Sequence, residues 1–257
     1  MIRDPLFDVS GKAALVTGAS SGLGEHFAKA LAARGAIVVA AARRADRLDR
    51  LVAQVASEGG TAHAVSLDVT DSASVKAAVA RAVDLSGGLD ILVNNAGIAD
   101  THPSMDLPEE SWRRVIDTNL DGAWRVAQAS AQAMLAGGRG GSIVNIASVL
   151  GLRVANNLLA YSAAKAALIQ VTKALALEWA RHGIRVNAIA PGYIETEMNS
   201  GFFRSEAGKA MVMKIPQRRI GTPRDLEGAL LLLASGAGAY MTGAVVVADG
   251  GHVVNSL

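Results

Sequence analysis

The sequence predicts an α/β fold in which a doubly wound, seven-stranded parallel sheet carries helices on both faces. Short runs rich in β-branched residues alternate with longer Ala- and Leu-rich stretches of helical periodicity along the 257 residues. Most of the short runs are continuously apolar, as expected of strands that are covered on both sides. Repeated alternation of this kind predicts right-handed crossovers. No linker interrupts it, so we expect a single domain over residues 1–257.

Each element is placed by its pattern. Strands are expected at 13–17, 36–42, 62–67, 90–95, 142–147, 185–190 and 244–248. Helices are expected at 25–34, 46–57, 72–86, 109–136, 158–182 and 223–235. Glycines stand where these helices should stop, at Gly35, Gly87, Gly88, Gly137 and Gly183.

Two segments break the alternation, 95–110 and 191–222, and each follows a strand. Ligands of open α/β sheets bind at the carboxyl ends of the strands, so these segments are the expected pocket walls. We expect a small substrate lid at about 197–219. Its apolar side chains, which either line the pocket or pack beneath the lid, are Met198, Phe202, Phe203, Met211 and Met213.

Composition limits the class of protein. With 51% hydrophobic and 19% charged residues the chain can bury a large core, and a net charge of +2 argues against nucleic acid or an anionic membrane as the main partner. No cysteine is present, and the five histidines show no ligand spacing, so no metal site is expected. Acidic residues and a proline interrupt the N-terminus, and the longest apolar runs are too short to cross a bilayer. We therefore expect a soluble, cytoplasmic protein.

The first strand runs directly into GASSGLGEHFAKAL, with glycines at 18, 22 and 24 before a predicted helix. Such glycines let the backbone turn tightly and approach a phosphate, to which a helix N-terminus offers N–H groups and partial positive charge. The spacing is wider than G-x-G-x-x-G and lacks the G-K-[ST] ending of a P-loop. The alternative is a glycine-rich turn without a ligand, but its place after the first strand favours a nucleotide.

The end of the second strand indicates which nucleotide. Ala42 stands where an acid would bind the ribose 2′-OH of NAD, and Arg43 and Arg44 follow it. An arginine can grip the 2′-phosphate of NADP, so NADP(H) is favoured over NAD(H). The alternative is a pair of solvated arginines.

Tyr161 and Lys165 share one helix face at i and i+4 in the stretch YSAAK. A nearby ammonium favours the phenolate and would lower the tyrosine pKa, giving a proton donor and acceptor. The alternative is a core tyrosine beside a lysine that reaches solvent. Ser148 follows a central strand, where its hydroxyl could bond a substrate carbonyl. Asn119 stands in an apolar helix, where an amide is disfavoured.

The motifs occur together in the order and spacing of the short-chain dehydrogenase/reductase family, which the chain resembles from about residue 10 to 252. They are TGASSGLG (17–24), LDV (67–69), NNAG (94–97), Asn119, Ser148, YSAAK (161–165) and PGYIET (191–196). The resemblance implies a Rossmann-type fold and hydride transfer between a nicotinamide and a carbonyl or alcohol.

The resemblance also implies roles. Tyr161 would be the acid/base, and Lys165 would lower its pKa and hold the nicotinamide ribose. Ser148 would orient the carbonyl, and Asn119 would kink its helix to hold a water in a proton relay. The implied cofactor residues are Gly18, Ser20, Gly22, Leu23 and Gly24 at the pyrophosphate and ribose, Asp68 and Val69 beside the adenine, Asn95, Ala96 and Gly97 beneath the ribose, and Pro191, Gly192, Ile194 and Thr196 at the nicotinamide.

The family's cofactor rule also favours NADP at Ala42–Arg43. Many NADP-preferring members add a basic residue within the glycine loop, whereas this chain has Ser20 and Ser21.

The substrate stays open between a small or medium ketone and a 3-oxoacyl thioester. Reductases of carrier-bound acyl groups often have an arginine where this chain has Leu177, which argues against a carrier-protein substrate. A catalytically silent, nucleotide-sensing regulator is a further alternative, but it predicts an altered Tyr, Lys or Ser. An epimerase or dehydratase typically has a longer C-terminal domain.

The resemblance implies a homotetramer or a dimer. Helices 109–136 and 158–182 would form one interface and the C-terminal strand another. The sequence gives modest independent support, because helix 158–182 is apolar around most of its surface.

Overall fold

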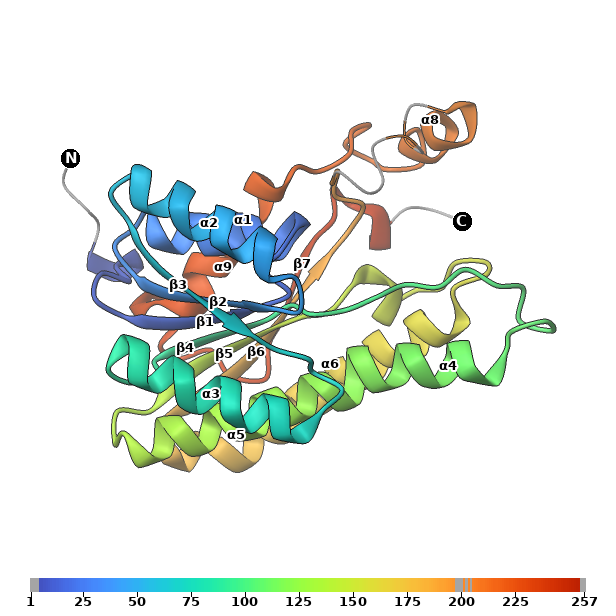
Figure 1. Cartoon of the computed structure of the whole chain (residues 1–257). Coiled ribbons are helices and arrows are strands. Elements are labelled where there is room, and N and C mark those ends of the chain that lie inside the picture. The colour runs from blue at the N-terminus through green and yellow to red at the C-terminus, as the bar shows by residue number, and fades with distance from the viewer. Residues whose placement is uncertain (1–4, 197–200, 202, 204, 255–257) are drawn as a thin grey trace.

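Figure 1 shows the computed structural model of the chain, which describes residues 5–196, 201, 203 and 205–254. A seven-stranded sheet has the order β3-β2-β1-β4-β5-β6-β7, and every neighbouring pair is parallel. The strands are β1 (Ala13–Thr17), β2 (Ile37–Ala42), β3 (Thr61–Ser66), β4 (Ile91–Asn94), β5 (Gly141–Ile146), β6 (Ile184–Pro191) and β7 (Val245–Ala248). Strand order reverses between β1 and β4, so a topological switch point opens at their carboxyl ends. The predicted Rossmann-type fold class is confirmed.

Helices cover both faces of the sheet (Figure 1). They are α1 (Gly22–Ala32), α2 (Ala45–Ser57), α3 (Ser72–Ser86), α4 (Glu109–Ile116), α5 (Gly122–Ala136), α6 (Leu159–Trp179), α8 (Glu206–Val212) and α9 (Glu227–Ala234). One buried cluster packs α1, α2 and α9 against the sheet, and a second packs α3, α5 and α6 against the other face. Alternate residues of a strand enter opposite clusters: Val38 and Ala40 lie in the first, Val39 and Ala41 in the second.

The predicted helix 109–136 is interrupted. The chain leaves α4 at Ile116, forms a π-helical turn over Asp117–Asp121, and resumes as α5 at Gly122. Asn119 lies in this turn and is fully buried. A π turn widens the backbone spacing locally, which turns the amide towards the sheet. Further along, α6 is followed by a 3-10 turn, and Gly183 ends it in the left-handed region (φ +70°).

The two edge strands depart from the expectation of continuous burial. Most residues of β3 are exposed or half-buried, and in β7 every residue is at least partly accessible. An edge strand has a neighbour on one side only, so its apolar composition does not by itself imply burial.

A chain of buried polar side chains fixes the centre of the sheet. Asn94 Nδ2 donates to Asn145 Oδ1 (3.0 Å) and to the Ala123 carbonyl (2.7 Å), and Asn145 Nδ2 donates to Thr172 Oγ1 (2.9 Å). Thr172 Oγ1 in turn donates to the Leu168 carbonyl at 2.7 Å. These bonds join α5, β4, β5 and α6, so they fix how α6 lies on the strands that carry the candidate site.

The segment after β6 contains a helix that the sequence analysis did not predict. Helix α8 projects from the body of the molecule in Figure 1. Met198 and Phe202 of the predicted lid lie outside the described residues, whereas Phe203 is buried. Within the described part of the chain, no helix has the length and hydropathy needed to cross a bilayer.

Candidate active site

The predicted site residues gather along one edge of the sheet, where the carboxyl ends of the strands meet. Gly18 follows β1, Asn95 follows β4, Ser148 follows β5 and Gly192 follows β6. Helix α6 brings Tyr161 and Lys165 to the same edge. The structure therefore brings together residues that are up to about 170 positions apart in the sequence.

Lys165 is the buried cation of this site. Its side chain donates from Nζ to the Ile146 carbonyl at 2.7 Å, and the residue is 4% exposed. Ile146 is the last residue of β5, so the bond ties α6 to the strand end that precedes Ser148. Burial disfavours the charged form and lowers the Lys165 pKa from 10.5 to about 8.

Tyr161 lies between Lys165 and Ser148. The Lys165 Nζ atom is 5.6 Å from the centre of the Tyr161 ring, and the Ser148 side chain is near enough to the Tyr161 hydroxyl to affect its pKa. Burial raises the Tyr161 pKa, and Ser148 lowers it by less. We expected Lys165 to lower this pKa. In the structure burial is the largest effect on this pKa and raises it, and the lysine ammonium donates to the Ile146 carbonyl.

Ser148 is held at the end of β5 by its own turn. Its Oγ accepts from the Leu150 N–H at 3.1 Å and thereby caps the 3-10 turn Val149–Gly151. The residue is 8% exposed. A hydroxyl held this way can still donate towards a ligand, because a serine oxygen carries one proton and two acceptor sites.

Asn119 lies in the π-helical turn, and its side chain is bonded to the backbone of Ile98. Its Oδ1 accepts from the Ile98 N–H and its Nδ2 donates to the Ile98 carbonyl, both at 2.7 Å. The amide therefore pairs with backbone as a neighbouring strand would, and it fixes the segment after β4. Gly97 lies against it, since a Cβ there would be 3.0 Å from Asn119 Oδ1 and 3.6 Å from Lys165 Nζ. A side chain at position 97 would crowd Asn119 and come into contact with Lys165.

The loop between β1 and α1 is packed so closely that side chains at its glycines would collide with neighbouring atoms. Gly18 and Gly22 have φ of +67° and +57°, the left-handed region. A Cβ at Gly24 would lie 2.4 Å from the Gly18 carbonyl oxygen, and one at Gly18 would lie 2.9 Å from Asn95 Nδ2. Helix α1 begins at Gly22 and points its N-terminus into the loop. This close-packed backbone fits a nucleotide diphosphate.

Thr17 is a site residue that the sequence analysis missed. Its Oγ1 accepts from the N–H groups of Asn95 (2.9 Å) and Ala96 (3.0 Å), while Asn95 Nδ2 donates to its carbonyl (3.0 Å). These bonds join the ends of β1 and β4, which are the two strands on either side of the switch point. The available signal was a polar residue at the end of an otherwise apolar strand.

Arg44 is a second missed residue. Its guanidinium donates to Ser20 Oγ (2.9 and 3.2 Å) and to Ser21 Oγ (2.8 Å), so a cation from the start of α2 stands on the glycine loop. Arg43 is exposed, and its charge contributes to the lowered pKa of Asp68. The sequence analysis noted both arginines but selected only Arg43.

Asp68 and Val69 follow β3, as predicted for the adenine end. Asp68 accepts from the Thr70 hydroxyl (2.7 Å) and from the Thr70 N–H (3.0 Å), and these bonds, with a smaller contribution from Arg43, lower its pKa. Val69 is 7% exposed and lies against Gly122, where a Cβ would be 2.8 Å from Val69 Cγ2.

The segment after β6 lies at the carboxyl ends of β6 and β7, on the same side of the sheet as the glycine loop. A Cβ at Gly192 would lie 2.7 Å from Asp249, so β6 and the end of β7 meet here without room for a side chain. Pro191 ends β6, and Ile194 is buried and forms a bridge with Gly221. Thr196 Cγ2 is 3.7 Å from the position of a Cβ at Gly22, which brings this segment beside the glycine loop.

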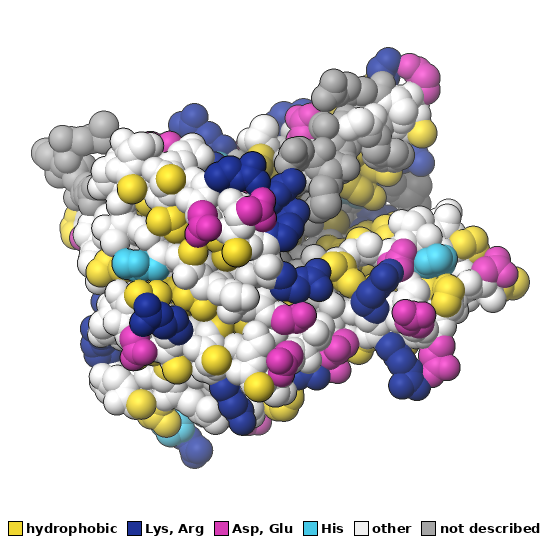
Figure 2. All heavy atoms as spheres, viewed as in Figure 1, with side chains coloured by type: hydrophobic (Ala, Val, Ile, Leu, Met, Phe, Trp, Pro, Cys, Tyr) yellow, Lys and Arg dark blue, Asp and Glu magenta, His cyan; other side chains and the backbone are white. Residues whose placement is uncertain are grey.

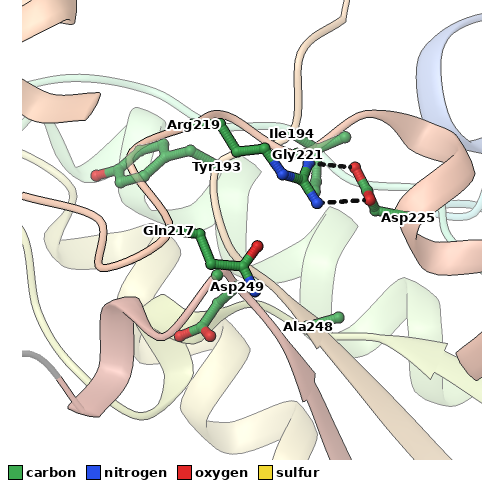
Figure 3. A pocket seen from close by; sticks show the side chains of 9 residues that line it. Tyr193, Ile194, Gln217, Arg219, Gly221, Asp225, Ala248 and Asp249 are labelled. Carbon is green, nitrogen blue, oxygen red and sulfur yellow. Dashed lines mark hydrogen bonds and ion pairs between the residues drawn. The ribbon is translucent and has the colours of Figure 1, made fainter. Parts of the chain in front are cut away.

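A cavity of about 230 Å³ lies next to this segment (Figure 3). Arg219 turns towards Asp225 and makes two bonds of 2.8 Å, which hold the Asp225 pKa far below its usual range, whereas Gln217 points into the centre of the cavity. Tyr161 and Ser148 do not line it. Among the described residues, no group of three or more His, Asp or Glu side chains is arranged to hold a metal ion.

Replacing Gly24 by alanine should destabilise the protein, because the new methyl group meets the Gly18 carbonyl and the Asn95 amide within 2.5 Å. We expect a loss of about 1–3 kcal/mol in the free energy of unfolding, as for overpacked sites. Gly228→Ala is the matched control. It also lies in the first turn of a helix, where a Cβ has nothing within 4 Å, and should be neutral or slightly stabilising. Equal unfolding midpoints in urea for the two variants would contradict the close packing of this loop.

The buried lysine predicts a pH-dependent stability. Between about pH 8 and 10.5 the unfolded chain holds the Lys165 proton and the folded chain has released it, so the free energy of unfolding rises with pH across this window. The shift corresponds to about 3 kcal/mol at about 1.4 kcal/mol per pKa unit. In urea titrations, wild type should gain stability relative to Lys165→Met between about pH 7 and pH 10. A difference that does not change with pH would show that the ammonium is not desolvated.

Comparison with known proteins places this geometry. A family model described as "Enoyl-(Acyl carrier protein) reductase" matches residues 18–253. Galactitol 2-dehydrogenase (L-tagatose-forming) of Cereibacter sphaeroides is 41% identical over 97% of this chain and 98% of its own length. D-threitol dehydrogenase of Mycolicibacterium smegmatis is 38% identical over 96% of this chain and 95% of its own.

Solved structures agree. A short-chain type dehydrogenase/reductase from Mycobacterium marinum superposes with a TM-score of 0.91 at 42% identity, covering 96% of this chain and 97% of the other. A gluconate 5-dehydrogenase from Burkholderia cenocepacia, in complex with NADP and tartrate, has a TM-score of 0.94 at 36% identity, with 98% and 99% covered. The chain therefore belongs to the short-chain dehydrogenase/reductase family and is an NAD(P)-dependent oxidoreductase that interconverts alcohol and carbonyl groups.

Proposed function

We propose that this enzyme interconverts a polyol or sugar alcohol and its ketone, favours NADP(H), and uses Tyr161 as its acid/base. The observation that carries the proposal is the grouping of buried Lys165 and Ser148 with half-buried Tyr161, at the carboxyl end of β5 and in the first turns of α6. A desolvated lysine beside a half-buried phenol is costly to maintain, and it has a use where a proton must move.

The proton path follows from the contacts. The substrate oxygen would lie between the Ser148 hydroxyl and the Tyr161 hydroxyl, two groups that are close enough for Ser148 to affect the Tyr161 pKa. In oxidation the Tyr161 phenolate takes the proton from the substrate hydroxyl, and in reduction the phenol returns it. Lys165, held by the Ile146 carbonyl, stabilises the phenolate by its charge. The nicotinamide, when bound, supplies the hydride acceptor in one direction and the donor in the other.

The cofactor would lie along the edge of the sheet. Gly18, Ser20, Gly22, Leu23 and Gly24 would hold the pyrophosphate at the start of α1, with Asp68 and Val69 at the adenine. Asn95, Ala96 and Gly97 would lie beneath the ribose, and Pro191, Gly192, Ile194 and Thr196 would face the nicotinamide. Asn119 serves this arrangement by fixing Ile98, directly after Gly97.

The positive charge near the end of β2 supports a preference for NADP(H) over NAD(H). Lys and Arg side chains gather near the start of α2, beside the hollow that separates the body from α8 (Figure 2). Ala42 leaves room at the end of β2, Arg43 is exposed there, and Arg44 adds its charge at Ser20 and Ser21. We assign the 2′-phosphate to Arg43 and the support of the glycine loop to Arg44. The NADP-bound gluconate 5-dehydrogenase is consistent with this.

The relatives support the substrate class. Galactitol and D-threitol dehydrogenases are similar to this chain over nearly its full length, and both names denote polyol substrates. The thioester alternative has less support, because Leu177 is 83% exposed where carrier-protein reductases were expected to present an arginine.

The proposal includes a homotetramer. Large apolar side chains are exposed on the helices and strand that were predicted as interfaces: Trp124 and Leu135 on α5, Leu177 on α6 and Val247 on β7. Light scattering at micromolar concentration should give four times the mass of the chain. The small substrate lid at about 197–219 likewise stays a prediction.

A rate screen tests the activity. Purified enzyme would be mixed with NADP⁺ or NAD⁺ and galactitol, sorbitol, D-threitol or gluconate, and with NADPH or NADH and 3-oxoacyl thioesters. We expect polyol oxidation that is faster with NADP⁺. Tyr161→Phe should bind NADPH normally and lose turnover by about 10²–10⁴-fold, the usual contribution of a general acid/base. Thioester reduction without polyol oxidation would overturn the substrate class, and near-normal turnover of Tyr161→Phe would overturn the proton transfer.

Substitutions of Arg43 and Arg44 should affect the binding of NADPH and NADH differently. Arg43→Ala should weaken NADPH binding by about 10-fold or more, as expected for a lost charge-assisted bond, and leave NADH binding unchanged. Arg44→Ala should weaken both cofactors, because it releases Ser20 and Ser21 of the glycine loop. Fluorescence titration gives both dissociation constants. Equal losses for NADPH and NADH in Arg43→Ala would remove Arg43 from the 2′-phosphate.

A further inference from the structure

The loop Leu152–Leu158 joins Ser148 to the helix that carries Tyr161. It forms neither helix nor strand, so contacts with other segments must set its position. Its start is rigidly tied to Ser148: the Gly151 N–H donates to the Ser148 carbonyl, and the N–H groups of Leu152 and Arg153 both donate to the Val149 carbonyl at 2.8–2.9 Å. A displacement of Arg153 would therefore be transmitted to Ser148.

Arg153 fastens this loop to the C-terminal segment. Its Nη1 donates to the carbonyls of His252 (2.9 Å) and Val253 (3.2 Å), about a hundred residues away in the sequence. Both acceptors belong to the 3-10 turn His252–Val254, which follows β7 and is started by Asp249, whose carboxylate accepts from Gly251 and Val253. At its far end the loop is held again, since the Asn157 carbonyl accepts from the His102 N–H at 3.0 Å.

The same C-terminal turn reaches the segment after β6. The His252 ring lies 5.3 Å from the Tyr193 ring, and the Tyr193 ring lies 6.0 Å from Phe203. Tyr193 directly follows Gly192, and Figure 3 shows its ring pointing away from the Arg219–Asp225 pair. His252 Nδ1 is buried without a hydrogen-bond partner among the described residues. The turn is thus packed between Tyr193 on one side and the loop that carries Arg153 on the other.

We infer that residues His252–Val254 form a wall of the substrate pocket, that Arg153 is the positioning residue that holds this wall against the Ser148 loop, and that the wall selects polyols by chain length. The inference rests on the proposed polyol dehydrogenase function. Its basis is that one short turn contacts both the loop that follows Ser148 and Tyr193, which lies directly after Gly192. Breaking the bonds between Arg153 and this turn should enlarge the part of the substrate pocket that is distant from Tyr161. The residues that would bind the cofactor should not be affected.

The first test compares substrates of different length. For wild type and Arg153→Met, kcat/KM would be measured with galactitol and with D-threitol at saturating cofactor. The ratio of the two values should change by about fivefold, the equivalent of one lost hydrogen bond, through KM rather than kcat. Arg153→Lys can still donate to one of the two carbonyls, so its ratio of kcat/KM values should lie between those of wild type and Arg153→Met. Arg181→Met, in the exposed 3-10 turn that follows α6, is the matched control and should leave the ratio unchanged.

A chain that stops after Gly251 provides the second arm, because it removes both acceptors of Arg153. It should reproduce the altered ratio, and adding Arg153→Met to it should have no further effect. Additive effects would show that Arg153 acts on something other than this turn and would overturn the inference, as would an unchanged ratio in Arg153→Met.

Hydrogen exchange keeps the two proposals distinguishable. Amides of residues 150–153 and 252–254 should exchange faster in Arg153→Met than in wild type and in Arg181→Met, whatever the substrate. If wild type oxidises no polyol but exchange increases in Arg153→Met as expected, the polyol assignment fails, and the inference that Arg153 holds the turn His252–Val254 against the Ser148 loop is still supported. If exchange at both segments is unchanged in Arg153→Met, then Arg153 does not hold the two segments together, whichever substrates the enzyme accepts.

Discussion

The hydrogen bond from Lys165 to the Ile146 carbonyl is the interaction around which this site is organised. It places an ammonium group where water is excluded, at a desolvation cost that one neutral acceptor offsets only in part. The residual cost appears as a pKa near 8. The bond joins α6 to the end of β5, and in doing so it sets Tyr161 beside Ser148. The buried chain Asn94–Asn145–Thr172 fixes the same helix two turns further along, so α6 is located at two points by polar contacts rather than by packing alone.

The cofactor edge depends on a different constraint, which is the absence of side chains. Gly18, Gly24 and Gly97 are positions where a Cβ would come within about 3 Å of backbone or of a site residue. Thr17 and Asn95 lock the two strands on either side of the switch point, which keeps this crowded backbone in register. Tight backbone packing here and buried charge on α6 meet at Gly97, which lies close to both Asn119 and Lys165. The glycine loop and the proton-transfer residues are thus parts of one packed unit.

Most of the fold could be predicted from the sequence, because apolar runs and glycine stops report directly on strands and helix ends. The central strands fall within about one residue of their predicted bounds, for example β5 at Gly141–Ile146. Local periodicity could not reveal the π turn around Asn119, since its hydrogen bonds depend on Ile98 in another segment. Nor could it tell which of two adjacent arginines turns to the glycine loop, or that Arg153 meets residues 252 and 253. Such contacts are set by tertiary packing and leave no periodic signal.

The central claim is that Lys165 makes Tyr161 a usable acid/base, although burial alone raises the tyrosine pKa. The direct measurement is an NMR titration of the protein with ¹³C-labelled tyrosine side chains, with Tyr161 assigned by its loss in Tyr161→Phe. We predict that Tyr161 ionises at lower pH in wild type than in Lys165→Met, because the two groups titrate as a coupled pair in which a phenolate keeps the neighbouring ammonium protonated, while Tyr193 titrates identically in both. An equal Tyr161 pKa in the two proteins would contradict the account and leave the buried lysine with a purely structural role.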